Sequence, residues 1–221
     1  ALLDALDSKV DIAGDIQVLQ GQVADTLAHA SPHLNVHDKM VIDAASPTHD
    51  DPMFGLTIPA GPGESLVDSV SQIEGVSAVQ MMRPSMMVVT THIEGGPRPE
   101  ESVETVDDEG AAAQRAHIAR LRDEIWSLNG SENLRWLFIT DDDVDLSAEG
   151  WRRKLLWQFF CRFEVARDLH FDETRSRLAW DATAPIPSNS GPHPVRRWPG
   201  VTLQDPEVEA KVDAWMEDNN L

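Results

Sequence analysis

One short apolar run in the second half of the chain predicts a strand that is buried on both faces. Residues 137–140 read Leu-Phe-Ile-Thr without a charged position, and such uninterrupted runs are typical of parallel sheets. The run ends at Asp141, the first of several acidic residues, which are poor strand formers. We therefore expect an acidic corner at the carboxyl end of a central strand, where open α/β sheets usually meet ligands and partners.

Apolar spacing elsewhere predicts an alternation of strands and helices. Strands are expected at residues 16–19, 40–44, 53–58, 76–80, 86–93, 166–171 and 178–181, and helices at 22–30, 64–73, 111–128, 147–163 and 205–215. Ser147 is the expected N-cap of the helix that follows the acidic run. The pattern predicts an α/β layered sheet with flanking helices, formed by residues 64–221, after an irregular N-terminal extension and linker at residues 1–63.

Two apolar groups fit either the core or a subunit interface. The predicted helix at 147–163 is apolar almost all round, which implies burial on two sides. Packing on the core by one side and on another subunit by the other would satisfy this helix. Four methionines at 81, 82, 86 and 87 leave the same choice between core filling and subunit contact.

Charge and composition narrow the class of partner. The 221 residues carry a net charge of −20, of which residues 1–110 contribute −15 (19 acids, 4 bases). Such a surface argues against nucleic-acid binding.

The chain has one cysteine and no apolar run near the ~20 residues of a membrane span, so we expect a cytoplasmic protein. Its first residue, Ala1, is what removal of an initiator Met would leave.

Several interpretations of the polar clusters compete. His29, His33 and His37 have helical metal-ligand spacing, but Pro32 interrupts a helix there. The acidic run, residues 141–145, is compatible with a metal-dependent GT-A-like glycosyltransferase or a phospho-acceptor aspartate. In the structural alternative, the acids pair with basic residues and fix the corner between strand and helix. The candidate partners are Arg152, Arg153 and Arg167.

The motifs around the acidic run resemble the C-terminal domain of UbiD-type decarboxylases. The similar segments are residues 138–145, 156–157, 161–168, 180–183 and 198–200, with a weaker match at 50–54. The similarity extends over about residues 40–205. Its most specific part is the run Asp-Asp-Asp-Val-Asp together with the Arg-Asp pair at 167–168.

The resemblance implies a subunit without its own catalytic centre. The family uses prenylated FMN, which is held with a divalent metal, and a Glu-Arg-Glu set of residues in an earlier domain. No positions in this chain match the residues that hold the metal or the Glu-Arg-Glu set. We therefore expect no catalytic, cofactor-binding or metal residue in this chain. The resemblance implies the smaller subunit of a split decarboxylase or carboxylase that acts on an aromatic or α,β-unsaturated carboxylic acid.

In that hypothesis a larger UbiD-like catalytic subunit holds the cofactor, and the two chains form a hetero-oligomer. The residues expected to have structural or interface roles are Asp141, Asp142, Asp143, Asp145, Trp157, Arg167, Asp168 and Asp181. The alternatives are the glycosyltransferase, with Asp141 and Asp143 at the metal, and an orphan assembly or regulatory protein.

Overall fold

The computed structural model describes residues 3, 6, 7, 10–23, 36–44, 64–94, 96, 105–191, 193–197 and 206–218. The helices are α2 (Ile12–Asp15), α3 (Glu64–Ser71), α4 (Asp108–Ser127), α5 (Trp151–Arg162), α6 (Val165–Asp168) and α7 (Pro206–Asp218), with a 3-10 turn at Ser131–Asn133. The strands are β1 (Ile16–Val23), β2 (Val36–Ile42), β3 (Val76–Arg83), β4 (Met86–Thr91), β5 (Trp136–Asp141), β6 (Leu169–Phe171) and β7 (Leu178–Asp181). In this described part, no helix is both long and apolar enough to cross a membrane.

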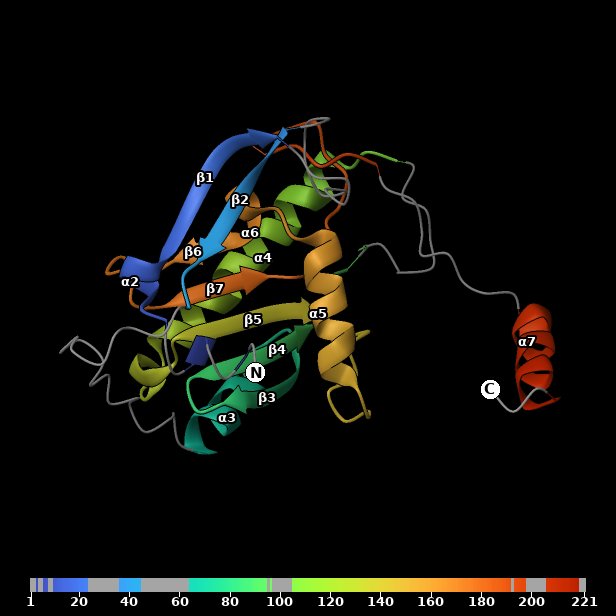
Figure 1. Ribbon diagram of the computed structural model, residues 1–221. Coiled ribbons are helices and arrows are strands. Elements are labelled where there is room, and N and C mark those ends of the chain that lie inside the picture. Colours follow the sequence, from blue (N-terminus) through green and yellow to red (C-terminus); the bar gives the residue numbers. More distant parts are fainter. Residues whose placement is uncertain are drawn as a thin grey trace.

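The main sheet has five strands in the order β3-β4-β5-β7-β6, and β1 and β2 pair separately as an antiparallel ribbon. The three central strands, β4, β5 and β7, run parallel, whereas β3 and β6 are antiparallel to their neighbours. Helices lie on both faces, with α5 on one side and α3 and α4 on the other (Figure 1). The predicted α/β layered architecture is therefore confirmed.

Strand β5 is central because its side chains enter two cores. Trp136 and Phe138 belong to the core beneath α5, whereas Leu137 and Ile139 belong to the core beneath α3 and α4. Successive side chains of a strand point to opposite faces, so an uninterrupted apolar run can supply both layers. All four residues are buried.

Aromatic rings dominate the core beneath α5. Trp180 of β7 contacts Phe138 edge-on, with ring centroids 4.6 Å apart, and stacks on Phe159 of α5 at 4.7 Å. Apolar residues near the N-terminus are buried in the same cluster: Leu6, Val10, Ile12 and Ile16. The described part of the expected N-terminal extension thus contributes to the core of the layered sheet.

The core on the opposite face is mostly aliphatic. Leu66 and Val70 of α3 and Leu121 and Ile125 of α4 are fully buried there. The methionine group belongs to the two cores, since Met82, Met86 and Met87 are buried. For these three residues, core filling is the correct alternative.

Three predicted elements differ from the structure. Residues 22 and 23 continue strand β1 instead of starting a helix, and the rest of that prediction lies outside the described residues. Helix α5 begins at Trp151, because Ser147 donates to the Asp145 carboxylate in a turn and Gly150, with φ 81°, occupies the N-cap. The strand expected from residue 166 begins with a helical turn, α6.

The other predicted elements are found close to their expected positions. They are the strands β1, β2, β3, β4, β5 and β7 and the helices α3, α4 and α7. The strand predicted at 53–58, and His29 and His33 of the histidine series, lie outside the described residues.

Truncating the aromatic core residue Phe138 should destabilise the protein strongly. Phe138→Ala should lower the free energy of unfolding by about 3–5 kcal/mol, because it leaves a cavity between β5, β7 and α5. Phe160→Ala is the matched control, since this ring is exposed on α5, and it should change stability by no more than about 0.5 kcal/mol. Urea unfolding followed by tryptophan fluorescence measures both. Equal losses would contradict the assignment of Phe138 to a tightly packed core.

Candidate functional site

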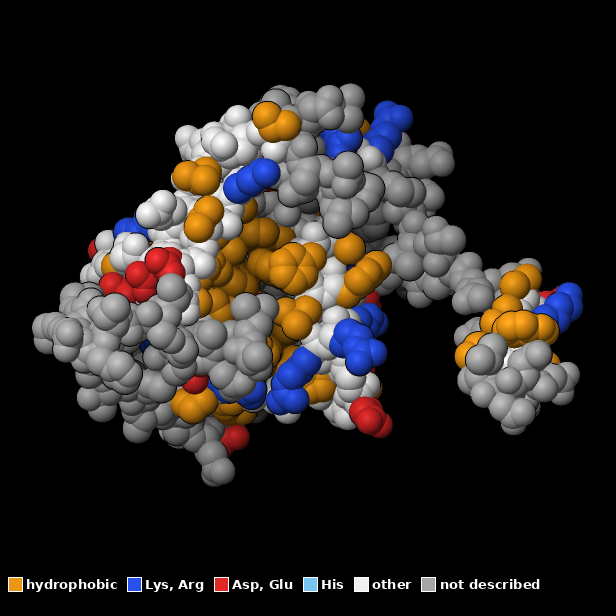
Figure 2. Space-filling view, in the orientation of Figure 1, with side chains coloured by type: hydrophobic (Ala, Val, Ile, Leu, Met, Phe, Trp, Pro, Cys, Tyr) orange, Lys and Arg blue, Asp and Glu red, His pale blue; other side chains and the backbone are white. Residues whose placement is uncertain are grey.

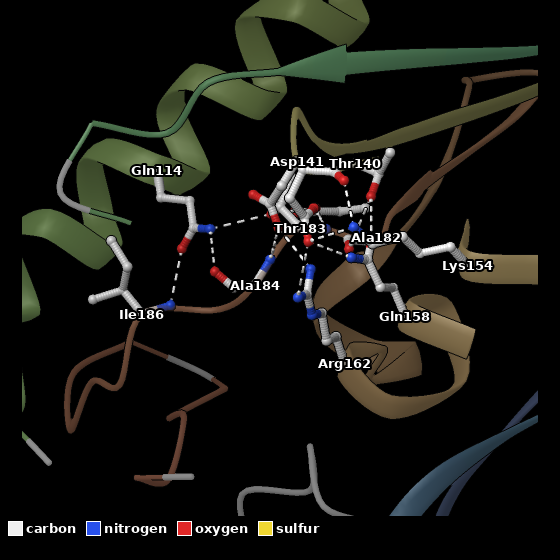
Figure 3. Close-up of polar contacts among 12 residues, drawn as sticks. Gln114, Thr140, Asp141, Lys154, Gln158, Arg162, Ala182, Thr183, Ala184 and Ile186 are labelled. Atoms are coloured by element: carbon white, nitrogen blue, oxygen red, sulfur yellow. Dashed lines mark hydrogen bonds and ion pairs between the residues drawn. The ribbon is translucent and has the colours of Figure 1, made fainter. Parts of the chain in front are cut away.

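The polar side chains at the carboxyl ends of the parallel strands form the candidate site. Asp141 ends β5, where it pairs in register with Thr91 of β4, and Asp181 ends the neighbouring strand β7. Because these strands are parallel, their carboxyl ends lie at the same edge of the sheet. Side chains from α4 and α5 converge on this edge (Figure 3).

Asp141 is held in a buried ion pair with Arg162 from the last turn of α5. One carboxylate oxygen, Oδ2, accepts from Arg162 Nη1 at 2.7 Å and from the backbone N–H of Ala184 at 2.7 Å. Burial raises the pKa of Asp141 to about 6, and Arg162 opposes this shift. One carboxylate therefore links β5, α5 and the segment after β7.

A second chain of contacts joins the same strand to the middle of α5. Thr140 donates to Gln158 Oε1 at 3.2 Å, and Gln158 Nε2 donates to Asp143 Oδ2 at 2.7 Å. Lys154 lies 3.5 Å from the same oxygen and also donates to the backbone carbonyl of Asp143. The acidic run is thus fixed to one face of α5.

Gln114 connects helix α4 to the segment that follows β7. Its Nε2 donates to the Thr183 hydroxyl at 3.1 Å and to the Ala184 carbonyl at 2.8 Å, and its Oε1 accepts from the Ile186 N–H at 3.0 Å. Gln114 is buried, so these contacts satisfy an amide that water does not reach.

Asp181 adopts a tight turn with Thr183. Its Oδ1 accepts from the Thr183 N–H at 2.9 Å and from the Thr183 hydroxyl at 2.6 Å. Burial, with the nearby charge of Asp168, raises the pKa of Asp181 to about 7, although Thr183 and Arg167 oppose the shift. Near neutral pH this carboxyl group is therefore a partly protonated acid in the interior.

Arg167 and Asp168 form the most buried ion pair of the site. Arg167 Nε and Nη2 each donate to one oxygen of Asp168 at 2.5 Å, and Nη2 also donates to the Arg162 carbonyl at 2.7 Å. Asp168 Oδ2 accepts from the Glu164 N–H at 2.7 Å, which closes the turn of α6. Arg167 Nη1 is buried without a hydrogen-bond partner.

The prediction of which basic residues pair with the acidic run was wrong. The structure pairs Asp141 with Arg162, while Arg167 pairs with its neighbour Asp168 and Arg152 stacks over Trp151. Arg162 carries a usable signal in the sequence. It continues the buried series of Leu155 and Phe159 at helical spacing, and a charge on the apolar face of a helix requires a buried partner.

The remaining candidate residues lie at the surface of the corner. Asp142 is 3.2 Å from His92 Nδ1, and Asp145 accepts from Ser147. Trp157 is exposed on α5 and lies outside the buried network. Gln114 and Gln158, which sequence patterns did not single out, connect the network to the two flanking helices.

The described residues do not fit a metal or a flavin at this edge. Among them, no three His, Cys, Asp or Glu side chains lie where they could hold a metal. Arg162 and Gln158 engage Asp141 and Asp143, so the glycosyltransferase alternative finds no support. The cavity next to Asp181 has a volume of about 230 Å³, below the ~300–1,000 Å³ of ordinary ligand pockets, and it is lined by two aspartates.

Solved structures that are similar to the chain belong to UbiD-class enzymes, the family that the sequence motifs resemble. Vanillic acid decarboxylase of Sedimentibacter hydroxybenzoicus, in open form, is 15% identical with a TM-score of 0.42 over 71% of this chain and 32% of that chain. An evolved dimeric form of HmfF from Pelotomaculum thermopropionicum, in complex with prFMN, is 16% identical with a TM-score of 0.38 over 66% and 27%. The chain thus spans about a third of their length. No family model matches it.

Removing the arginine of the central ion pair should destabilise the fold. Arg162→Met should lower the free energy of unfolding by about 3–5 kcal/mol, because it leaves the Asp141 carboxylate buried without its partner. Arg153→Met, at an exposed position of the same helix, should change stability by no more than about 0.5 kcal/mol. Chemical unfolding at neutral pH checks both, and the double variant Arg162→Met, Asp141→Asn should recover part of the loss. An Arg162→Met variant as stable as the Arg153 control would show that the ion pair does not stabilise the fold.

Three buried acids should contribute a fall in stability as the pH rises from about 4 to about 7. The pKa values of Asp141, Glu164 and Asp181 are raised to about 6, 7 and 7, each chiefly by burial. Their unfolded-state values lie near ~4, so the folded chain holds protons in this window that the unfolded chain has released. Asp181→Asn should remove up to about 1.4 kcal/mol per pH unit of this dependence.

Unfolding free energies measured by urea titration across the window test the pH prediction. Asp172→Asn is the control with the opposite sign. Burial raises the pKa of Asp172, but hydrogen bonds led by the Arg177 amide outweigh it and keep the pKa below the usual value. The stability that Asp172 contributes is lost only below about pH 4, so its removal should leave the slope between pH 4 and 7 unchanged. An unchanged slope in Asp181→Asn would refute the assignment.

Proposed function

We propose that this chain is the smaller, non-cofactor-binding subunit of a split UbiD-like decarboxylase or carboxylase. Its substrate would be an aromatic or α,β-unsaturated carboxylic acid. In this proposal, a larger UbiD-like subunit holds prenylated FMN with a divalent metal, and that cofactor supplies the chemistry at the scissile carboxyl group. This chain supports assembly and the closure of the active site, and the complex is cytoplasmic.

The observation that carries the proposal is the joining of the family-like motifs into one buried network. Segments 138–145, 161–168 and 180–183 are far apart in the sequence, yet hydrogen bonds join them at one edge of the sheet. Arg162 donates to the Asp141 carboxylate, and the Thr140 hydroxyl donates to the Ala182 carbonyl at 3.5 Å. Neighbouring residues of the same chain take up the hydrogen bonds of Asp141, Gln158 and Arg162. Residues whose polar groups are occupied in this way stabilise the shape of the surface and are poorly placed to donate or accept protons in a reaction.

Helix α5 supplies a surface suited to a protein partner. Its inner side is in the core, while Trp157 is 48% exposed and Phe160 is 68% exposed. The two rings are three residues apart, which places them on one face of the helix. Figure 2 shows hydrophobic side chains gathered over this part of the molecule. Large aromatic anchors surrounded by polar residues are the usual centre of a stable interface.

The chain's own residues have two roles in this mechanism. The Asp141–Arg162 pair holds the end of α5 against the carboxyl ends of β5 and β7. The rings of Trp157 and Phe160 then enter the partner, and their burial would exclude water at the contact. The net charge of −20 favours a protein partner over nucleic acid.

Reconstitution with the larger subunit tests the proposal. The purified chain should neither bind a flavin tightly nor release carbon dioxide from an aryl acid, whereas coexpression with a UbiD-type polypeptide from the same source should give a stable complex with decarboxylase or carboxylase activity. Gel filtration and a carbon dioxide assay are the measurements. An active chain on its own would refute the proposal. Failure of every such polypeptide to associate would instead favour an orphan assembly or regulatory protein.

The exposed rings of α5 should control this association. Phe160→Asp should weaken the complex by at least about tenfold, because it places a charge in the centre of an apolar contact. Ala116→Asp is the control, since Ala116 is exposed on α4 over the opposite face of the sheet. Surface plasmon resonance with the larger subunit measures both. Equal affinities for the two variants would place the interface elsewhere on the molecule.

A further inference from the structure

Helix α7 presents an apolar stripe to solvent. The helix lies away from the layered sheet (Figure 1), and each of its side chains that the structure describes is exposed. Val208, Val212 and Trp215 share one side of the helix because of their spacing, and their exposed fractions range from 42% to 57%. Figure 2 shows hydrophobic side chains gathered on the visible side of α7. A helix of 13 residues is marginally stable in water unless its apolar side is packed, so burial of this stripe would stabilise it.

The outer side of α5 complements this stripe. Arg153, Trp157 and Phe160 are exposed and have the same spacing, which places them on one side of α5. The first turn carries three exposed basic residues, Arg152, Arg153 and Lys154, of which Lys154 also contacts the acidic run. The segment that forms α5 contains no acid, whereas the segment that forms α7 contains five acidic residues and one basic residue. Apolar contact and opposite charge therefore favour the same pairing of helices.

The connection to α7 is short enough for this contact to form within one chain. Arg167 donates to the carbonyl of Arg162 at the end of α5, and Val195 lines the same cavity as Arg167. The chain thus passes the carboxyl end of α5 shortly before α7 begins. The eight residues 198–205 lead on to α7, and eight residues can span at most about 26–29 Å. This reach exceeds the ~18 Å length of the 12-residue helix α5.

We propose that α7 docks antiparallel on the outer side of α5 of the same chain, from the detached position seen in Figure 1. Val208, Val212 and Trp215 then cover the two exposed rings of α5. In this orientation α7 begins near the carboxyl end of α5, and its acidic last turn meets the basic first turn of α5. The short connection raises the effective concentration of α7 at α5. Docked α7 covers the surface assigned above to the larger subunit. That exchange rests on the proposed function, whereas the docking itself does not.

Cross-linking through the single cysteine of the chain tests the docking. Cys161 is partly exposed on α5, next to Phe160. In the full chain, Val208→Cys should be joined to Cys161 by a short bismaleimide at least about tenfold faster than Ala210→Cys, because residue 210 lies on the opposite side of α7. Both positions have the same connection to α5, so proximity along the chain alone predicts equal rates. Internally cross-linked monomer on a denaturing gel is the expected product. Equal rates, or covalent dimers in place of monomers, would overturn the proposal.

A charge placed in the apolar stripe should uncover α5. Val212→Asp should make Cys161 react with N-ethylmaleimide at least about threefold faster than in the unsubstituted chain, because a buried unpaired charge opposes docking. Ala210→Asp adds the same charge on the opposite side of α7 and should leave the rate unchanged. Circular dichroism and thermal melting confirm that both variants are folded. An unchanged rate in folded Val212→Asp, or equal acceleration in the two variants, would overturn the proposal.

Discussion

The ion pair between Asp141 and Arg162 is the constraint on which the rest of the site depends. Two charges withdrawn from water are stable only when their geometry and remaining hydrogen bonds are good. The structure meets this requirement by placing the Ala184 amide on the same carboxylate oxygen and by packing the end of α5 on the aromatic core. Strand β5, helix α5 and the segment after β7 therefore share one arrangement in which the polar groups of all three are satisfied.

The two faces of the sheet stabilise this arrangement by different kinds of packing. Aliphatic packing from α3 and α4 covers one face, while stacked and edge-on rings fill the space beneath α5 on the other. The N-terminal segment completes the second core. There the Asp7 carboxylate accepts from the Ser85 N–H, and Arg135 donates to the Asp7 carbonyl. A segment without a clear period in its sequence thus becomes ordered through contacts with distant parts of the chain.

Local patterns predicted the elements that repeat a simple apolar period. Strand β5, helix α4 and the pair β3 and β4 follow from runs and spacings that any short window contains. The start of α5 was missed because Ser147, a good N-cap residue, is used in a turn with Asp145. Only part of the site could be predicted from the sequence. Its acids are visible in the sequence, but their arginine partner lies 21 residues from Asp141, and only its place on the apolar face of α5 distinguishes Arg162 from the other arginines.

The long connections of Gln114 bear on how the protein is made. This side chain of α4 binds the backbone of Ile186, 72 residues further along, and Asp141 binds Ala184, 43 residues further along. A ribosome adds roughly 5–20 residues each second, so the emerging acidic corner waits for seconds with its carboxylates in water. During synthesis, the central strand and its corner therefore stay open to chaperones until the segment after β7 has emerged.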